Sequence, residues 1–491
     1  MRTKARRLLY AGIVFLLLFA VLYTKEEITL AGNESSRFGV VQALGEQGVF
    51  YIEGTNFAST VDKLERNGHL YSDKPLPLSF CAALIHGVIH RVTGINFTEN
   101  RMLAIYLVNL LVSGGCNILL FILMFRHLRR TARGRIEWKF LLALAMPLTT
   151  WLGSYSVVMN NHTPAALALF GMIVALEKYR RKPTLQAAAI AAGCAGLAGA
   201  FDMPLGLLSG LAVLAGIWFS SPAGTEKMRF SGAVVVTGGA ICFGVLLLNF
   251  IAYGTVVPLY VADGSGSYRF VFLWSQFGEY CCECLFGFRG LFSYQPFLLL
   301  VFPAVWFLRK RLRVPDWCGL GTAAALIVFY MIFTNEYGGA SYGMRYLIPV
   351  IPVFWFVISR WILSWRPAVW NVVPVLLLLL WGCVTMLVGA YCPFCIANEG
   401  FRTPEGHFSR VIRSPFWGNL LVMNFERDPE GKYTQMMIDS FGPEYSFLHI
   451  YHSGVHMRKP ELVAQLLQSS LAERVGVKKT PGEESSPGGK D

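Results

Sequence analysis

Long apolar runs recur along almost the whole of this 491-residue chain, and they constrain its fold more than any other feature. FLLLFAVLY at 15–23 and VVPVLLLLLWGCV at 372–384 are two of them, and charged residues lie in clusters between such runs. A helix needs about 20 apolar residues to cross a bilayer, and lipid offers no partner for an open backbone. Since 54% of the residues are hydrophobic and only 15% are charged, the sequence predicts an all-α polytopic membrane protein.

Hydropathy predicts about eleven membrane-spanning helices. They are expected near 8–23, 101–125, 140–157, 164–177, 184–200, 204–220, 230–252, 291–308, 317–334, 346–363 and 367–390. The segment 76–93 is apolar enough to be a twelfth, but it carries His86, His90 and Arg91.

The positions of Lys and Arg decide whether 76–93 crosses. If it does not, the loops on the N-terminal side hold 22 Lys and Arg, against ten in the loops between helices on the other side. Cytoplasmic loops carry the excess of Lys and Arg. We therefore expect 76–93 to be an amphipathic or re-entrant helix on the outer face. The N-terminus is then cytoplasmic and the C-terminal hundred residues lie outside.

The same reasoning explains the net charge of +13, because the basic residues form short groups beside the apolar runs. No nucleic-acid partner is expected from that pattern. The predicted membrane domain is 1–390, with outer loops 24–100 and 253–290 that include juxtamembrane helices. A small non-cytoplasmic region, 391–475, and a disordered tail, 476–491, follow it. The cytoplasmic loops are too short to bind a nucleotide, so any chemistry is expected outside.

Five cysteines fall in segments predicted to lie outside the cytoplasm, where disulfides form. Cys392 is expected to pair with Cys395, or one of these two with a member of the group Cys281, Cys282 and Cys284, and a zinc site is the rival interpretation.

Three carboxylates of the first outer loop are candidates for a general base, namely Glu34, Asp62 and Asp73. Cations on the same side are Arg37, Lys74, Arg101, Arg269, Arg289 and Arg345. Positive charge is otherwise scarce on that side, so the presence of these cations needs a reason. Binding of a lipid phosphate would be one reason, and anchoring to lipid headgroups is the alternative. His69, His162 and Arg289 are candidates for a substrate cavity, although His162 could equally lie in a helix cap. Asp202 needs water or a partner in so apolar a setting.

Five motifs then coincide in order over about residues 10–365: NESSR, GHLYSDKPLPLSF, ENRMLAIYLVNLL, GLFSYQPFLLLVFPAVW and YGGASYGMRYLIPVIPVFW. They resemble bacterial GT-C glycosyltransferases of the protein O-mannosyltransferase and lipid A aminoarabinose transferase type. The resemblance implies an enzyme of the bacterial inner membrane. It would move a sugar from a polyprenyl phosphate donor to a lipid, glycan or protein acceptor outside the cytoplasm.

The resemblance also implies roles for particular residues. Glu34 takes the place of the family's acidic pair, which reads Asn33-Glu34 here, so Asp62 or Asp73 could be the base instead. Arg37, Lys74, Arg345 and Tyr346 match positions expected to bind the donor phosphate. The family's proline pair is split here as Pro75-Leu76-Pro77.

The expected reaction is a direct displacement that inverts the anomeric carbon and needs no nucleotide. No cofactor is required by the sequence, although a divalent metal on Glu34 with Asp62 or Asp73 stays open. Two other functions stay open as well: a transporter or flippase of a lipid-linked sugar, and a non-catalytic binding or assembly protein of the membrane.

Overall fold

The computed structural model describes residues 2–27, 32–221, 224–262, 274–334, 338–339, 341–366, 368–394, 414–457 and 459–476, and these are largely helical. The first outer loop contains α2 (Gly32–Gln42), η1 (Ala43–Gln47), β1 (Lys63–Arg66), β2 (His69–Ser72) and α3 (Leu76–Thr93). Around it, the first half of the bundle consists of α1 (Arg2–Tyr23), α4 (Arg101–Asn109), η2 (Leu110–Gly114), α5 (Gly115–Thr131), α6 (Ile136–Leu148), α7 (Trp151–Tyr155), α8 (His162–Arg181), α9 (Leu185–Phe201), α10 (Met203–Ser220) and α11 (Thr225–Tyr253).

The second half begins with α12 (Leu259–Ala262), α13 (Trp274–Phe286), α14 (Leu291–Tyr294), η3 (Pro296–Leu300) and α15 (Val301–Leu308). It continues with α16 (Val314–Phe333), η4 (Arg345–Val350), α17 (Ile351–Ile362) and α18 (Val369–Tyr391). The C-terminal region holds α19 (Pro415–Arg427), α20 (Lys432–Phe441), α21 (Pro443–His456), α22 (Pro460–Gln468) and α23 (Ser470–Arg474). The predicted tail lies almost wholly outside the described residues.

Eight helices among the described residues are long and apolar enough to cross a membrane, or nine if a pair bent by 97° near Gln295 is one span. The chain is therefore a polytopic helical membrane protein, as predicted, while the count of eleven is not reproduced. Two differences have a local reason. The predicted span 140–157 breaks at Thr149 and Thr150, where the Thr150 side chain caps α7 by accepting from the Leu152 amide. Helix α9 is apolar but only 17 residues long.

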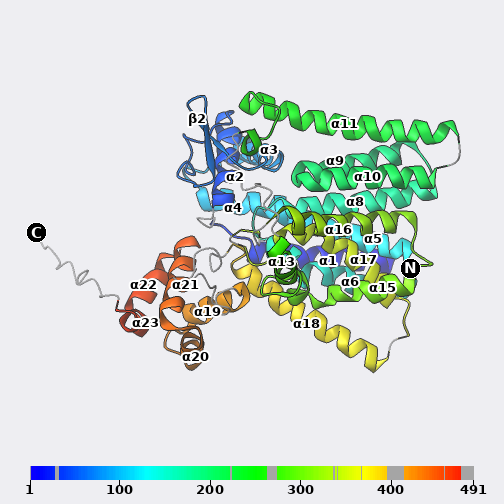
Figure 1. The fold of residues 1–491 in the computed structure, drawn as a ribbon. Helices are drawn as coiled ribbons and strands as arrows, with labels where there is room; N and C mark the ends of the chain where they lie inside the picture. Colours follow the sequence, from blue (N-terminus) through cyan, green and yellow to red (C-terminus); the bar gives the residue numbers. More distant parts are fainter. Residues whose placement is uncertain are drawn as a thin grey trace, which may run out of the picture.

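The first outer loop and the C-terminal helices lie at one end of the bundle, and the N-terminus of α1 lies at the other (Figure 1). Helix α3 is itself apolar enough to be counted among the eight. It packs against α2 and η1 at this end, next to the small hairpin of β1 and β2. The C-terminal helices have a core of their own, which includes Leu421, Phe425, Ile450, Leu462 and Leu466.

A tight turn joins α9 to α10 and determines where Asp202 lies. A Cβ added to Gly199 would sit only 2.5 Å from the Cα of Gly206, so the two helices touch backbone to backbone. Such close packing of small residues is common between helices in membranes. Asp202 lies in this turn. Asn161 donates to the carbonyl of the preceding residue, Phe201, and accepts from Arg37 of α2, so the turn lies beside the first outer loop.

The cysteine prediction is only partly covered by the described residues. Cys281, Cys282, Cys284 and Cys392 are all free thiols, so the predicted disulfide between Cys392 and that group is not formed. Cys392 is buried beyond the end of α18, and burial raises the pKa of its thiol to about 12. Cys395, its other predicted partner, lies outside the described residues, as does Arg269.

Candidate functional site

Lys74 and two aspartates form the first part of the candidate site, between β2 and α3. The ammonium Nζ of Lys74 lies 2.8 Å from a carboxylate oxygen of Asp62 and 3.1 Å from one of Asp73. All three side chains are between 20% and 28% exposed, so water reaches them. One cation is thus shared by two of the three predicted carboxylates, and Lys74 is already paired before any phosphate arrives.

Asp73 is the more perturbed of the two aspartates. Burial raises its pKa and the neighbouring Asp62 charge adds to that effect, against the opposing pull of Lys74 and Arg37. The hydroxyl oxygens of Ser36 and Ser72 lie 2.6 Å apart beside it, and Ser72 also accepts the Lys74 amide at 3.1 Å. A carboxyl group with a raised pKa binds a proton more readily, which is what a general base requires.

Arg37 connects this cluster to the membrane helices. It is 2% exposed, and its Nε donates to Asn33 Oδ1 at 3.1 Å. One terminal nitrogen lies 3.5 Å from the Pro75 carbonyl oxygen, next to Lys74, and the other donates to Asn161 Oδ1 at 3.3 Å. A buried guanidinium that bridges α2, the start of α3 and the start of α8 fixes the geometry of this end of the bundle.

His162, Asp202 and Tyr330 form a buried hydrogen-bonded group beside Arg37. Nδ1 of His162 lies 3.2 Å from one Asp202 oxygen, and the Tyr330 hydroxyl donates to the other at 2.6 Å. Asp202 therefore has the partners that its apolar surroundings require. Tyr346 completes the group, because its ring stacks on Tyr330 at 4.8 Å and meets the edge of His162 at 5.5 Å.

Arg345 enters from η4, immediately before Tyr346. Its guanidinium carbon lies 5.3 Å from the centre of the Phe394 ring and 5.7 Å from that of Tyr346. The charges of Arg345 and Arg37 both act on His162, which places the two guanidinium groups in one electrostatic environment. Arg289 contacts the segment that precedes Arg345. Its carbonyl accepts the Met344 amide at 3.1 Å, and its side chain donates to the Gly339 carbonyl at 3.3 Å.

Glu34 is fully buried in the first turn of α2. Its charge acts on Lys25 and Cys392, which lie beyond the ends of α1 and α18. Burial lowers the pKa of the Lys25 ammonium, and Glu34 is among the carboxylates that oppose this effect. Lys25 is therefore one cation in the neighbourhood of Glu34.

The structure brings most of the predicted site residues to one end of the bundle, but not all into one cluster. Asp62, Asp73 and Lys74 form one group, and Arg37 links it to a second that contains His162, Arg345 and Tyr346. His69 lies apart, 45% exposed, where it bonds Glu53 at 2.5 Å and stacks on Tyr51 at 4.3 Å.

The sequence left open a divalent metal on Glu34 with Asp62 or Asp73. Among the described residues, no three His, Cys, Asp or Glu side chains are grouped to hold a metal ion. Asp62 and Asp73 both bind the Lys74 ammonium.

Two residues that contact the predicted site residues, Tyr330 and Asn161, were not among the predicted candidates. Tyr330 lies in the apolar run of α16 and has no sequence signal of its own, although the lone charge of Asp202 indicated that some partner must exist. Asn161 both accepts from Arg37 and donates to the Phe201 carbonyl at 3.0 Å, so it connects α2 with the end of α9.

The fold is that of the GT-C glycosyltransferases, which confirms the predicted resemblance at the level of fold. ArnT from Cupriavidus metallidurans in the apo state is 15% identical, with a TM-score of 0.51 over 96% of this chain and 78% of that one. ArnT bound to undecaprenyl phosphate is 12% identical, with a TM-score of 0.50 over 95% and 77% of the two chains.

The arabinosyltransferase EmbB from Mycobacterium smegmatis is a more distant match, at 12% identity and a TM-score of 0.48. The alignment covers 92% of this chain but only 41% of EmbB, so this chain spans less than half of that protein. By sequence, neither a family model nor a curated protein matches the chain.

Proposed function

We propose that this protein is a membrane glycosyltransferase that moves a sugar from a polyprenyl phosphate donor to a lipid, glycan or protein acceptor on the non-cytoplasmic face. The observation that carries the proposal is the gathering of Arg37, Lys74 and Arg345 with Glu34 and Asp73 at one end of a GT-C fold. Glu34 and Arg37 are almost fully buried there, and an ionisable group buried in a membrane bundle supports the hypothesis of a functional site. ArnT, whose structure contains undecaprenyl phosphate, supports this choice of donor class.

The reaction is a single displacement. The acceptor oxygen or nitrogen attacks the anomeric carbon while the bond from that carbon to the phosphate oxygen breaks, and polyprenyl phosphate leaves with the electron pair. The acceptor proton passes to a carboxylate, for which we assign Glu34, with Asp73 and Asp62 as the alternatives. Arg37, Arg345 and Lys74 stabilise the negative charge that grows on the phosphate. The rings of Tyr346 and Phe394 position the Arg345 guanidinium.

An apolar groove offers a route for the lipid tail of the donor. A cavity of about 490 Å³ lies between α9, α10 and α11, lined mostly by Gly, Ala, Val and Leu, and Asn249 and Pro258 lie at one end of it. That end leads to the candidate site, because the Tyr253 ring at the end of α11 contacts Tyr71 at 5.3 Å, two residues before Asp73. A polyprenyl chain in this groove would bring its phosphate toward Lys74.

We propose eleven spans, with α3 on the outer surface, a cytoplasmic N-terminus and an outer C-terminus in a bacterial inner membrane. The arrangement in Figure 1 supports this orientation, because the first outer loop and the C-terminal helices both lie at the end of the bundle opposite the N-terminus. Reporter fusions near 130 and 440 test it. The fusion near 130 should report the cytoplasm and the one near 440 the outside, and the reverse result would overturn the orientation.

The function is tested with purified protein in liposomes. Candidate polyprenyl phosphate sugars are added with lipid, glycan or peptide acceptors, and release of polyprenyl phosphate is followed. Transfer should need no nucleotide, and the product should have the anomeric configuration opposite to that of the donor. Transbilayer movement of the donor without any release would instead favour a flippase.

A further inference from the structure

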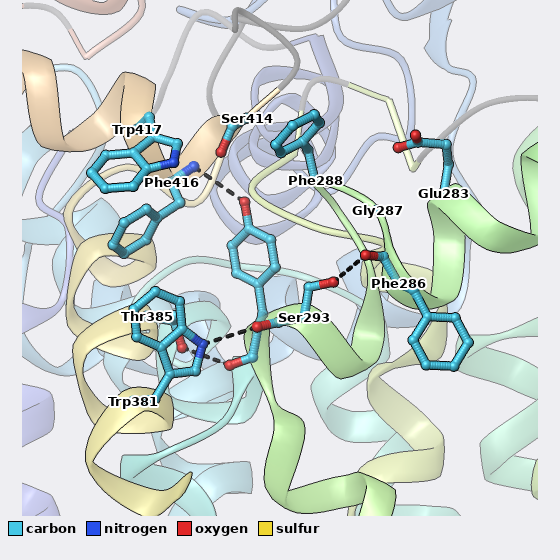
Figure 2. Close-up of a pocket in the computed structure, with 11 residues that line it drawn as sticks. Glu283, Phe286, Gly287, Phe288, Ser293, Trp381, Thr385, Ser414, Phe416 and Trp417 are labelled. Carbon is cyan, nitrogen blue, oxygen red and sulfur yellow. Dashed lines mark hydrogen bonds between the residues drawn. The ribbon is translucent and has the colours of Figure 1, made fainter. Parts of the chain in front are cut away.

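A second cavity, of about 420 Å³, lies between α13, α14, α18 and α19, outside the groups assigned above. Figure 2 shows it with its lining side chains. Its wall is mostly aromatic, contributed by Phe286, Phe288, Tyr294, Trp381, Phe416 and Trp417. A cavity of this size admits a small ligand or the headgroup of a larger one.

Four polar groups of this wall form hydrogen bonds within the protein itself. Trp381 Nε1 donates to the Ser293 carbonyl at 2.9 Å, and the Tyr294 hydroxyl accepts the Phe416 amide at 3.1 Å (Figure 2). The hydroxyl of Thr385 donates to the Tyr294 carbonyl at 2.8 Å, and that of Ser293 donates to the Phe286 carbonyl at 2.5 Å. The wall therefore offers aromatic surface and few hydrogen bonds.

Glu283 is the one charged side chain that lines the cavity among the described residues, and no Lys or Arg lines it there. In Figure 2 it lies on the side opposite Trp381 and Trp417. Its carboxylate rests against Gly287, where an added Cβ would lie 2.1 Å from Oε2. The glycine thus allows the carboxylate to fold back over the last turn of α13 and remain at the cavity edge.

We propose that this cavity binds an alkylammonium group. The negative faces of aromatic rings attract a cation, Trp most strongly, and a carboxylate neutralises its charge. A neutral sugar fits the wall less well, because its hydroxyls would need several donors and acceptors that the wall has already used. An aromatic belt that only anchors the protein at the membrane surface would have no use for a carboxylate at the edge of the cavity.

The cavity adjoins the segment that carries Arg345. The Tyr294 ring meets Tyr342 edge-on at 5.0 Å, and Tyr342 precedes Arg345 by three residues. The ammonium group could come from the headgroup of a bilayer lipid or from an amine on the acceptor. The proposal concerns binding, so it holds whether or not the proposed transfer reaction is correct.

The test uses the full chain in nanodiscs of phosphatidylglycerol and measures binding by calorimetry. Choline is compared with 3,3-dimethylbutan-1-ol, which has the same shape without the charge. We expect saturable choline binding at least tenfold tighter than that of the alcohol. Equal affinities, or no saturable choline binding, would overturn the proposal.

Two variants locate the site. Glu283→Gln removes the charge and should weaken choline binding at least tenfold, while Glu279→Gln, an exposed acid one turn earlier on α13, should not. Trp417→Leu removes a partly exposed ring and should weaken binding about threefold or more, with Trp370→Leu, the most exposed tryptophan of α18, as its control. Unchanged affinity in both Glu283→Gln and Trp417→Leu would contradict the assignment.

A competition experiment identifies the source of the amine. If the ligand is a lipid, adding phosphatidylethanolamine to the nanodiscs should weaken choline binding. If it is an acceptor, glucosamine should compete and N-acetylglucosamine should not. Either result supports an ammonium site, and competition by N-acetylglucosamine as strong as that by glucosamine would contradict it.

Discussion

Two groups of ion pairs at opposite ends of the helix bundle have opposite local balances of charge. At the end where α8 finishes, Glu177 accepts from Arg180 at 3.0 Å, Arg181 at 2.8 Å and Arg313 at 2.6 Å. Nearby, Asp316 accepts from Arg360 at 2.6 Å. At the other end, a single ammonium, Lys74, is shared by two carboxylates.

This difference separates structural ion pairs from groups able to react. The arginines around Glu177 come from α8 and from the residue before α16, so they bind neighbouring helices together and saturate the carboxylate. Around Lys74 the carboxylates outnumber the cation, and Asp73 has a raised pKa. We therefore expect changes at the first end to alter stability and changes at the second to alter turnover.

The largest effect should follow from Glu34→Gln. Loss of a positioned base typically lowers turnover by a hundredfold or more, while expression and donor binding should be preserved. Initial rates of polyprenyl phosphate release measure the effect, and Asp62→Asn and Asp73→Asn are the controls. Near-normal turnover in Glu34→Gln, together with loss in either aspartate variant, would move the base to that aspartate.

Glu177→Gln should show the opposite pattern. Replacing this nearly buried carboxylate weakens three charged hydrogen bonds and should lower the free energy of unfolding by about 2 kcal/mol. Turnover per folded molecule should stay within about twofold of the parent. Thermal unfolding in detergent measures the stability, with Glu226→Gln, an exposed acid near the same end, as the control. A tenfold loss of turnover in folded Glu177→Gln would contradict the separation of the two ends.

Lys74→Ala should have an intermediate effect on turnover, about tenfold, because it removes charge from the place where the leaving phosphate develops it. Lys74→Arg keeps the charge and should recover most of the rate. Lys63→Ala, on the same hairpin, is the matched control and should leave the rate unchanged. If Lys74→Ala changes only thermal stability, the lysine merely neutralises Asp62 and Asp73.

The smallest effect concerns Glu46 and acid stability. Its carboxylate accepts from the Phe97 amide at 2.8 Å and lies 2.8 Å from His86 Nε2. Burial raises its pKa, but these partners outweigh burial and leave it below the ordinary 4.5. Its stabilising effect is therefore complete above pH 4.5 and is lost as the pH falls through the lowered pKa.

Glu46→Gln should flatten the decline of the unfolding temperature at acid pH, without a change in turnover at neutral pH. Unfolding scans at several pH values below 5 measure this. An unchanged acid decline would mean that other carboxylates cause it.

The sequence predicted those features that depend on charge and apolar length. The helical membrane fold, the helix at 76–93 beside the first loop, and the need of Asp202 for a partner all follow from the cost of exposing polar groups to lipid. Lys74 lies near Asp73 because the two are neighbours in sequence. The ion pair of Lys74 with Asp62 depends instead on the hairpin of β1 and β2, whose fold the hydropathy pattern does not determine.

Features that depend on packing between distant segments were not predicted. Tyr330 reaches Asp202 across 128 positions of the sequence, and no local pattern records that contact. The break at Thr149 likewise depends on Thr150 turning its side chain onto the Leu152 amide rather than on a loss of hydropathy. His69 was predicted to line a substrate cavity, whereas the hairpin leaves its side chain 45% exposed.

The backbone contact between Gly199 and Gly206 bears on how variants of this protein would be interpreted. A methyl group at either position would separate α9 from α10 and displace Asp202, which lies between them and binds both His162 and Tyr330. A screen scored only by activity would thus single out two residues that have no functional group and contact no substrate. Their role is to lack side-chain volume, so that the two helices can pack closely. It would be mistaken for a chemical role unless the position of the Asp202 carboxylate were determined as well.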